Sequence, residues 1–232
     1  MGKLPDTGYR PERFVLADPA MPKRLVIGIV GHSDLHPAYR TQYLAQCKAA
    51  LAALQERHPE RTLEVMSALG VGAERIGAQA ALDLGLRLIV LLPPDSVSDP
   101  SADDAAANEY RELLLQVPIH NFQIPAPDTH GEHDGSPASL TRLIVTECQV
   151  LIALWDGMAS TRRNDTAELI DAKLMPQLHG LAAASAGPVL HICVSRGDVP
   201  QQRPSETLPN WLYPTVVVSK PQDRRRAHRA LL

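Results

Sequence analysis

The sequence predicts an α/β protein with a Rossmann-like, doubly wound and mainly parallel sheet that carries helices on both faces. Apolar runs of strand length alternate along the chain with segments whose apolar residues recur at helical spacing. The runs are rich in β-branched residues and do not alternate with polar ones, which is typical of strands buried on both faces. Short glycine-containing loops follow several of the runs, as strand-to-helix turns require.

The elements can be placed along the chain from these patterns. Strands are expected at residues 25–30, 63–66, 86–92, 121–124, 150–155, 189–194 and 215–218. Helices are expected through residues 43–54, 76–84, 110–114, 138–147 and 166–178. Residues 125–137 are expected to form an exposed loop, and the proline-rich stretch 199–214 is expected to be irregular.

Length and composition favour one globular domain. The chain has 232 residues, of which 44% are hydrophobic and 21% charged, enough to bury a full core. We expect one domain over residues 24–219, an extension of residues 1–23 before it, and a basic tail of residues 220–232 after it.

Charge and cysteine content limit the classes of partner. A formal net charge of -3 gives no global field that would attract a polyanion, so nucleic acid is not expected as a partner. The three cysteines are far apart and lack metal-binding spacing, which favours a reducing, cytoplasmic location. No apolar run approaches the length of a membrane span, so no membrane association is expected.

Three loops follow the carboxyl ends of expected strands: residues 31–34, residues 68–73, and the segment from 155 to 166. Such ends meet at one edge of a parallel sheet, and ligands bind there where the strand order reverses. Glycine lets the backbone approach a phosphate closely, and the N–H groups of a following helix favour an anion. We therefore expect a nucleotide or nucleotide-sugar ligand and no metal, although the glycines alternatively serve only the geometry of the turns.

The candidate ligand-binding residues come from these loops. They are Gly31, His32, Ser33, Leu69, Gly70, Gly72, Ala73, Arg75, Asp156, Gly157 and Thr166. Arg75 either reaches a phosphate or forms an ion pair, and Asp156 either accepts ribose hydroxyls or caps the next turn. Both Asp156→Ala and Gly72→Glu are expected to weaken binding without disturbing the fold, because both residues are placed at loop tips.

The alternation of His32, Asp34 and His36 superficially resembles a metal site. His36 precedes Pro37, and alternate residues of a turn need not converge. We therefore expect His32 to contact a ligand or to brace its loop rather than to bind a metal.

Three segments together resemble the SLOG superfamily: Val26 to His32, Ser67 to Arg75, and Leu151 to Gly157. Members of that superfamily include the LOG-type phosphoribohydrolases, DNA-processing protein A, sensor regions of melastatin-type channels, and nucleotide-sensing domains of bacterial antiviral systems. The resemblance covers residues 24–194. It implies a Rossmann-like fold in which these loops hold a nucleotide.

The chain departs from the family pattern at two positions. Where the family has a Gly-Gly-Thr or Gly-x-Gly-Thr phosphate loop, this chain has Arg163-Asn164-Asp165-Thr166, and Asp165 with Glu168 has the spacing of a helix capping box. LOG-type enzymes place a glutamate three residues after the threonine, where this chain has Leu169. Glu168 is one position early, a rotation of about 100° on a helix, so no catalytic residue is assigned.

The resemblance favours a sensor or binding domain for a nucleotide-derived small molecule, such as an ADP-ribose-type or cyclic nucleotide signal. We expect such a domain to form a homo-oligomer and to act with an effector protein or fused domain in bacterial defence signalling. One alternative is a LOG-like nucleotide phosphoribohydrolase or nucleosidase, which the missing glutamate disfavours. The other is a module that binds single-stranded DNA, which the acidic net charge disfavours.

Overall fold

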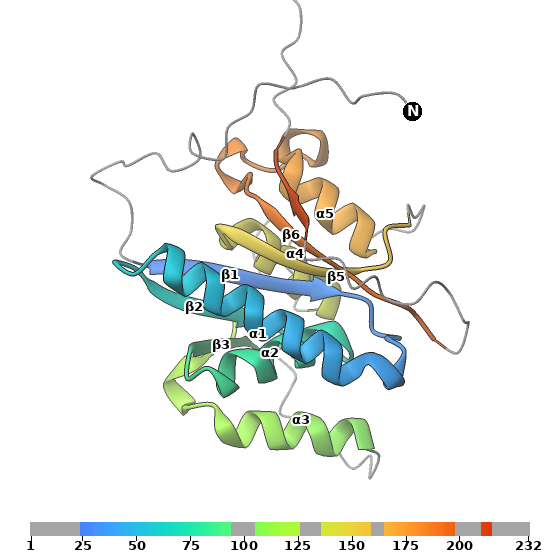
Figure 1. Cartoon of the computed structure of the whole chain (residues 1–232). Coiled ribbons are helices and arrows are strands. Elements are labelled where there is room, and N and C mark those ends of the chain that lie inside the picture. Colours follow the sequence, from blue (N-terminus) through green and yellow to red (C-terminus); the bar gives the residue numbers. More distant parts are fainter. Residues whose placement is uncertain (1–23, 94–104, 126–135, 159–164, 198–209, 215–232) are drawn as a thin grey trace, which may run out of the picture.

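The computed structural model describes residues 24–93, 105–125, 136–158, 165–197 and 210–214. Within these ranges the chain forms one seven-stranded sheet with helices on both of its faces (Figure 1). The expected extension of residues 1–23 and the basic tail of residues 220–232 lie outside the described ranges.

The sheet has the strand order β4-β3-β2-β1-β5-β6-β7. All neighbouring pairs are parallel except β6 and β7. The strands are β1 Arg24–Gly31, β2 Thr62–Ser67, β3 Arg87–Leu91, β4 Phe122–Gln123, β5 Val150–Trp155, β6 Val189–Cys193 and β7 Asn210–Leu212. Because the chain builds outward from β1 to β4 and then returns to place β5 on the other side of β1, the strand order reverses between β1 and β5. This topology confirms the Rossmann-like, doubly wound and mainly parallel sheet.

Five α-helices and four short 3₁₀ helices connect the described strands. The α-helices are α1 Arg40–Arg57, α2 Ala73–Asp83, α3 Ala105–Gln116, α4 Pro137–Glu147 and α5 Thr166–Leu174. The 3₁₀ helices are η2 Pro37–Tyr39, η3 Ile119–Asn121, η4 Pro176–His179 and η5 Ala183–Ser185. None of the described helices combines the length and apolar character that a membrane span needs.

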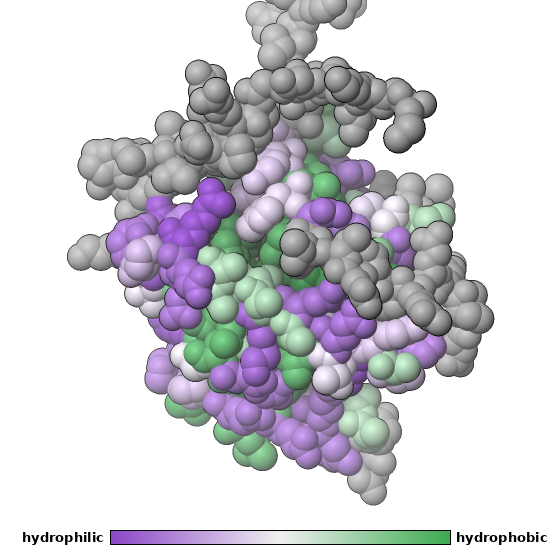
Figure 2. Space-filling view, viewed as in Figure 1, coloured by the Kyte–Doolittle hydropathy of each residue, from purple (hydrophilic) through white to green (hydrophobic). Residues whose placement is uncertain are grey.

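The central strands contribute side chains to two apolar cores, one on each face of the sheet. Ile27 and Ile29 of β1 pack with residues of α1, α2 and α3, whereas Val26 and Val30 pack with residues of α4 and α5. Successive side chains of a strand point to opposite faces, so a continuous apolar run supplies both cores. On the face drawn in Figure 2, hydrophilic residues cover much of α3, whereas hydrophobic residues, mainly alanines, run along the middle of α1.

Two glycines let helices approach β1 closely. A β-carbon on Gly77 of α2 would lie 2.6 Å from Cγ2 of Ile29, and one on Gly28 would lie 2.7 Å from Cγ2 of Ile144. The missing side chains therefore set the spacing between β1 and the helices on its two faces.

The structure differs from the sequence prediction at two elements. β7 lies inside the stretch 199–214 that was expected to be irregular, and it pairs antiparallel with β6 at the edge of the sheet. The strand expected at 215–218 falls outside the described residues. α5 ends at Leu174 instead of about residue 178, because Pro176 has no N–H to continue the helix and disfavours helical geometry at Met175.

A buried lysine ties α5 to its neighbours. Lys173 is fully buried, and its Nζ donates to the carbonyl oxygens of Val145 at 3.0 Å and Ser185 at 2.9 Å, and also to that of Cys148. Val145 belongs to the last turn of α4, whose carbonyl groups have no partner within the helix. The ammonium group therefore stabilises the end of α4 and joins it to η5.

We expect Lys173→Met to lower the free energy of unfolding by at least about 2 kcal/mol, because it removes the ammonium donor that three carbonyl groups share. Urea unfolding of the two proteins measures the difference. The matched control is Lys48→Met on α1, which removes only the partly exposed ion pair with Asp83 and is expected to cost less than about 1 kcal/mol. Equal losses for the two variants would show that Lys173 makes no special contribution.

Candidate functional site

The carboxyl ends of β1 and β5 lie side by side where the strand order reverses. Gly31 is in register with Leu154, and the N–H of His32 donates to the carbonyl oxygen of Leu154 at 3.1 Å. The first residue of α2 joins the same place, because the N–H of Ala73 donates to the carbonyl oxygen of His32 at 3.1 Å. The structure thus brings the loop after β1 into contact with the end of β5 and the start of α2.

Close backbone packing explains two of the candidate glycines. A β-carbon on Gly31 would lie 2.6 Å from Cβ of Ala73. Gly72 has a φ of +84°, and a β-carbon there would lie 2.6 Å from the carbonyl oxygen of Ser33. Gly72 is buried and is no loop tip, so the expectation that Gly72→Glu leaves the fold undisturbed is corrected.

The loop between β2 and α2 is held by the side chain of Glu74. One carboxylate oxygen accepts from the N–H groups of Ala68 at 3.1 Å and Gly70 at 3.0 Å, and the other accepts from the hydroxyl of Thr141 at 3.3 Å. Burial raises the pKa of Glu74, although the hydrogen bonds from Gly70, Ala68 and Thr141 oppose the rise. The side chain of Leu69 is buried in the core at a φ of +56°, so Leu69 offers only its backbone to the loop.

The side chain of Arg75 forms its hydrogen bonds with other groups of the protein. Its Nε donates to the carbonyl oxygen of Leu69 at 3.1 Å, and Nη1 donates to the carbonyl oxygen of Ala106 at 2.6 Å and to Glu109 at 3.0 Å. The guanidinium also lies over the ring of Tyr110. The structure therefore shows the ion-pair alternative for Arg75, which braces its loop against α3.

Three buried polar side chains meet at the reversal point, and we call them the His32–Asp156–Thr166 cluster. Nε2 of His32 lies 3.1 Å from Oδ1 of Asp156, and Nδ1 lies 3.4 Å from the hydroxyl oxygen of Thr166. Their loops follow β1 and β5 and precede α5. The Nε2 contact is within ion-pair distance, but its angle is not that of a hydrogen bond, so this buried nitrogen lacks an aligned partner.

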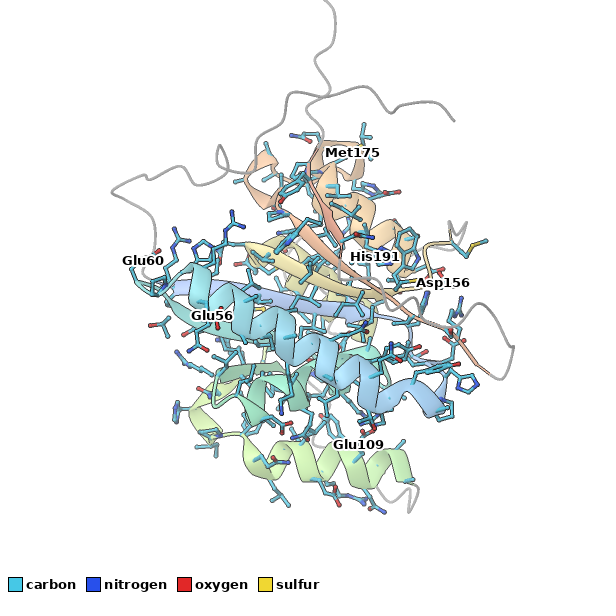
Figure 3. The ribbon with its side chains drawn as sticks, viewed as in Figure 1. Glu56, Glu60, Glu109, Asp156, Met175 and His191 are labelled. Carbon is cyan, nitrogen blue, oxygen red and sulfur yellow. The ribbon has the colours of Figure 1, made fainter. Side chains whose placement is uncertain are left out.

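Asp156 also caps its own turn and meets a residue that the sequence did not identify. Its Oδ1 accepts from the N–H of Met158 at 3.0 Å, and its Oδ2 lies 3.5 Å from Nη1 of Arg196. Burial alone would raise the pKa of Asp156, but the Met158 amide, His32 and Arg196 together lower it below its ordinary value. In Figure 3, Asp156 lies at the opposite end of the sheet from Glu56 and Glu60.

Arg196 joins Asp156 to the loop after β1. Its Nε donates to Oδ1 of Asp34 at 2.9 Å, and its Nη2 donates to Oδ2 at 3.0 Å. This bidentate hydrogen bond lowers the pKa of Asp34. Arg196 follows the strand expected at residues 189–194, and the carboxyl end of that strand lies at the same end of the sheet as those of β1 and β5. Its position after a strand is the sequence feature that could have identified Arg196 as a site residue.

The alternating residues of the first loop diverge. Asp34 turns to Arg196, His32 to Asp156, and Nδ1 of His36 accepts from the N–H of Ala38 at 3.2 Å. Among the residues that the structure describes, no group of three or more histidine, cysteine, aspartate or glutamate side chains is arranged to hold a metal ion.

At the start of α5 the structure shows the capping alternative for Asp165. Oδ1 of Asp165 accepts from the N–H of Thr166 at 2.5 Å. Glu168 lies 4.0 Å from Nδ1 of His179, and Leu169 is buried in the core. Residues 159–164, which include the rest of the altered phosphate loop, lie outside the described residues.

The arrangement offers defined chemistry to a ligand. His32 presents its ring nitrogens between a carboxylate and a hydroxyl, and the carboxylates of Asp34 and Asp156 accept from O–H and N–H groups. Arg196 presents a partly exposed guanidinium that suits a phosphate. Gly157 is exposed, and among the residues that the structure describes none would lie within 4 Å of a β-carbon there.

The sequence matches no family model and no curated protein. Two solved structures of DNA processing protein A are similar to the chain. The protein from Streptococcus pneumoniae is 14% identical, with a TM-score of 0.41 over 75% of this chain and 52% of that one. The protein from Helicobacter pylori, described by its single-stranded DNA binding mode, is 15% identical, with a TM-score of 0.38 over 64% of this chain and 60% of that one.

This chain therefore spans just over half the length of either protein. The likeness concerns the fold alone, and the Rossmann-like fold is confirmed by the strand order and parallel pairing of the chain's own sheet. The expectation that nucleic acid is no partner was wrong, because a protein of similar fold is described as binding single-stranded DNA.

We expect two of the positive-φ glycines of the site, Gly72 and Gly157, to respond differently to alanine. Gly157→Ala meets no described residue within 4 Å and is expected to cost about 1 kcal/mol for its φ of +80° alone. Gly72→Ala adds a collision with the backbone of the first loop, so its loss of unfolding free energy is expected to be about 1–3 kcal/mol larger. Urea unfolding compares them, and an equal cost would contradict the close packing of these loops.

Protonation of Asp156 is expected to destabilise the fold in acid. Its pKa is lower in the folded chain, so its contribution is complete above the ordinary value of 3.8 and is lost as pH falls through the folded-state pKa. Asp156→Asn should lower the free energy of unfolding by about 1–3 kcal/mol at neutral pH. Below pH 3.8 the difference from the wild type should shrink. Unfolding curves over a pH series test this, and a difference that stays constant with pH would contradict it.

Proposed function

We propose that this domain binds a nucleotide unit at the carboxyl ends of β1 and β5. The observation that carries the proposal is the His32–Asp156–Thr166 cluster at the reversal of strand order. Ligands of open α/β sheets bind outside the carboxyl ends of the strands at this point.

The burial of the cluster supports a binding role. Polar groups removed from water cost free energy unless they are fully paired, yet Nε2 of His32 is buried without an aligned hydrogen bond. A ligand group that pairs with this nitrogen, or with the adjacent Asp156, removes that cost. Nucleotides supply such groups on the base and sugar, and their phosphate suits the guanidinium of Arg196.

The first candidate ligand that we propose is single-stranded DNA, in which the bound nucleotide is one unit of the strand. The protein from Helicobacter pylori, which shares the fold, is described by its single-stranded DNA binding mode. In this form the exposed Arg196 side chain leaves Asp34 for a backbone phosphate, and Asp156 accepts from an N–H group on a base.

A free nucleotide is the second candidate, and the two carboxylates beside Arg196 favour it. Asp34 and Asp156 are acceptors without their own protons, and the hydroxyls of a ribose are donors that DNA lacks. This candidate includes the ADP-ribose-type and cyclic nucleotide signals. Product analysis of the bound nucleotide distinguishes simple binding from glycosidic hydrolysis.

The test is fluorescence anisotropy of labelled oligo-dT and the matching oligo-U, with competition by AMP and ADP-ribose. We expect Asp156→Ala to weaken binding at least about tenfold, which corresponds to about 1.4 kcal/mol. The control is Arg57→Ala, the last residue of α1, which follows Glu56 at the end of the sheet opposite Asp156. This variant should bind like the wild type.

The outcomes separate the candidates. Binding of oligo-dT that weakens as salt rises and resists competition by free nucleotides supports single-stranded DNA. Displacement of the oligonucleotide by ADP-ribose, or preference for ribose over deoxyribose, supports the free nucleotide. If none of these ligands binds, or if Asp156→Ala and Arg57→Ala weaken binding equally, the proposed site is wrong.

A further inference from the structure

A partly exposed tryptophan lies directly beside the candidate site. Trp155 is the last residue of β5, and its side chain packs on the face of the sheet that α4 and α5 cover. The next residue is Asp156, whose Cα lies about 3.8 Å along the chain. Trp155 is therefore an aromatic neighbour of the His32–Asp156–Thr166 cluster at the same end of the sheet.

The indole of Trp155 is held in place by two neighbours. Its Nε1 donates to the carbonyl oxygen of Met158 at 3.0 Å. The ring of His191 lies 5.2 Å away between centroids at a tilt of 49°, and Nε2 of His191 donates to the carbonyl oxygen of Trp155 at 2.9 Å. Figure 3 shows His191 and Asp156 toward the same part of the molecule. Because the only polar atom of the indole is already paired, any further contact of Trp155 is made through its ring.

The surroundings of the ring suit an apolar, flat group. Met158, which closes the turn after β5, is 65% exposed, and Gly157 between it and Asp156 carries no side chain. Asp34 and Asp156 pair with Arg196 at the same end of the sheet. An aromatic residue, an exposed apolar residue and charged groups therefore follow one another at the end of β5, and a nucleotide likewise combines a flat base with a charged phosphate.

We propose that Trp155 is a base-stacking residue, on whose ring the base of the nucleotide lies. An N–H group on the edge of that base, or a ribose hydroxyl, then reaches Asp156, and the phosphate reaches Arg196. The proposal rests on the function proposed above and adds the location of the base. Stacking on an aromatic ring tolerates every base, because each presents a π face. The subsite would therefore add affinity without sequence specificity.

The chain contains two tryptophans, Trp155 and Trp211, which allows a direct spectroscopic test. In the Trp211→Phe variant, Trp155 is the only indole that emits. Titration with oligo-dT, and separately with AMP, should quench or shift this emission with the same midpoint as the anisotropy change. In the Trp155→Phe variant the emission of Trp211, on β7, should stay unchanged while binding persists.

Affinity gives the second readout. Trp155→Leu should weaken binding of oligo-dT by about 5- to 150-fold, the range that loss of one base–aromatic stack produces. Trp155→Phe keeps an aromatic ring and should recover most of that affinity. Circular dichroism and the thermal unfolding midpoint show whether Trp155→Leu folds. The emission titration uses the Trp211→Phe variant, so it does not depend on the folding of Trp155→Leu.

Two results would overturn the inference while the proposed function stands. In one, the ligand binds by anisotropy but the emission of Trp155 does not change. In the other, Trp155→Leu folds and binds like the wild type, so the ring only packs against the core. If neither oligo-dT nor AMP binds the wild-type chain, the proposed function and this inference fail together.

Discussion

The arrangement of the site depends on the backbone of His32. Its N–H donates to Leu154 at the end of β5, and its carbonyl oxygen accepts from Ala73 at the start of α2. Both main-chain hydrogen-bonding groups of this one residue are therefore used to join three elements. The contact requires glycine on both sides, since a side chain on Gly31 or Gly72 would collide with the neighbouring backbone or with Ala73. With its backbone fixed in this way, the imidazole of His32 is directed to Asp156 and Thr166.

The loop between β2 and α2 is held by side chains rather than by main-chain hydrogen bonds. The carboxylate of Glu74 holds the amides of Ala68 and Gly70, and Arg75 ties the same loop to α3 through Glu109. Elements held this firmly lose little conformational freedom when a ligand binds, so more of the contact free energy appears as affinity. Arg196 and Trp155 at this end of the sheet are partly exposed, so their side chains are accessible from solvent beside the more buried His32 and Asp156.

The sequence was informative where a local pattern decides the structure. The apolar, β-branched runs placed β1 and β5 to within a residue, and glycine marked the turns that pack against other backbone. Contacts between distant segments were not predictable in the same way. Arg75 opens a helix like a phosphate-binding residue, but its partner Glu109 is 34 residues further along the chain. Arg196 was missed because its pairing with Asp34 spans 162 residues, and β7 because it has only three residues in a proline-rich stretch.

The central claim is that a nucleotide unit binds where β1 and β5 end, and mapping of backbone amide shifts by NMR tests it most directly. Addition of oligo-dT, and separately of ADP-ribose, to the labelled domain should shift the amides of His32, Gly70 and Asp156 most strongly. The amides of Glu56 and Glu60, at the end of the sheet opposite Asp156, should stay unchanged. Shifts that concentrate at that opposite edge or on α3, with none around His32 and Asp156, would contradict the account.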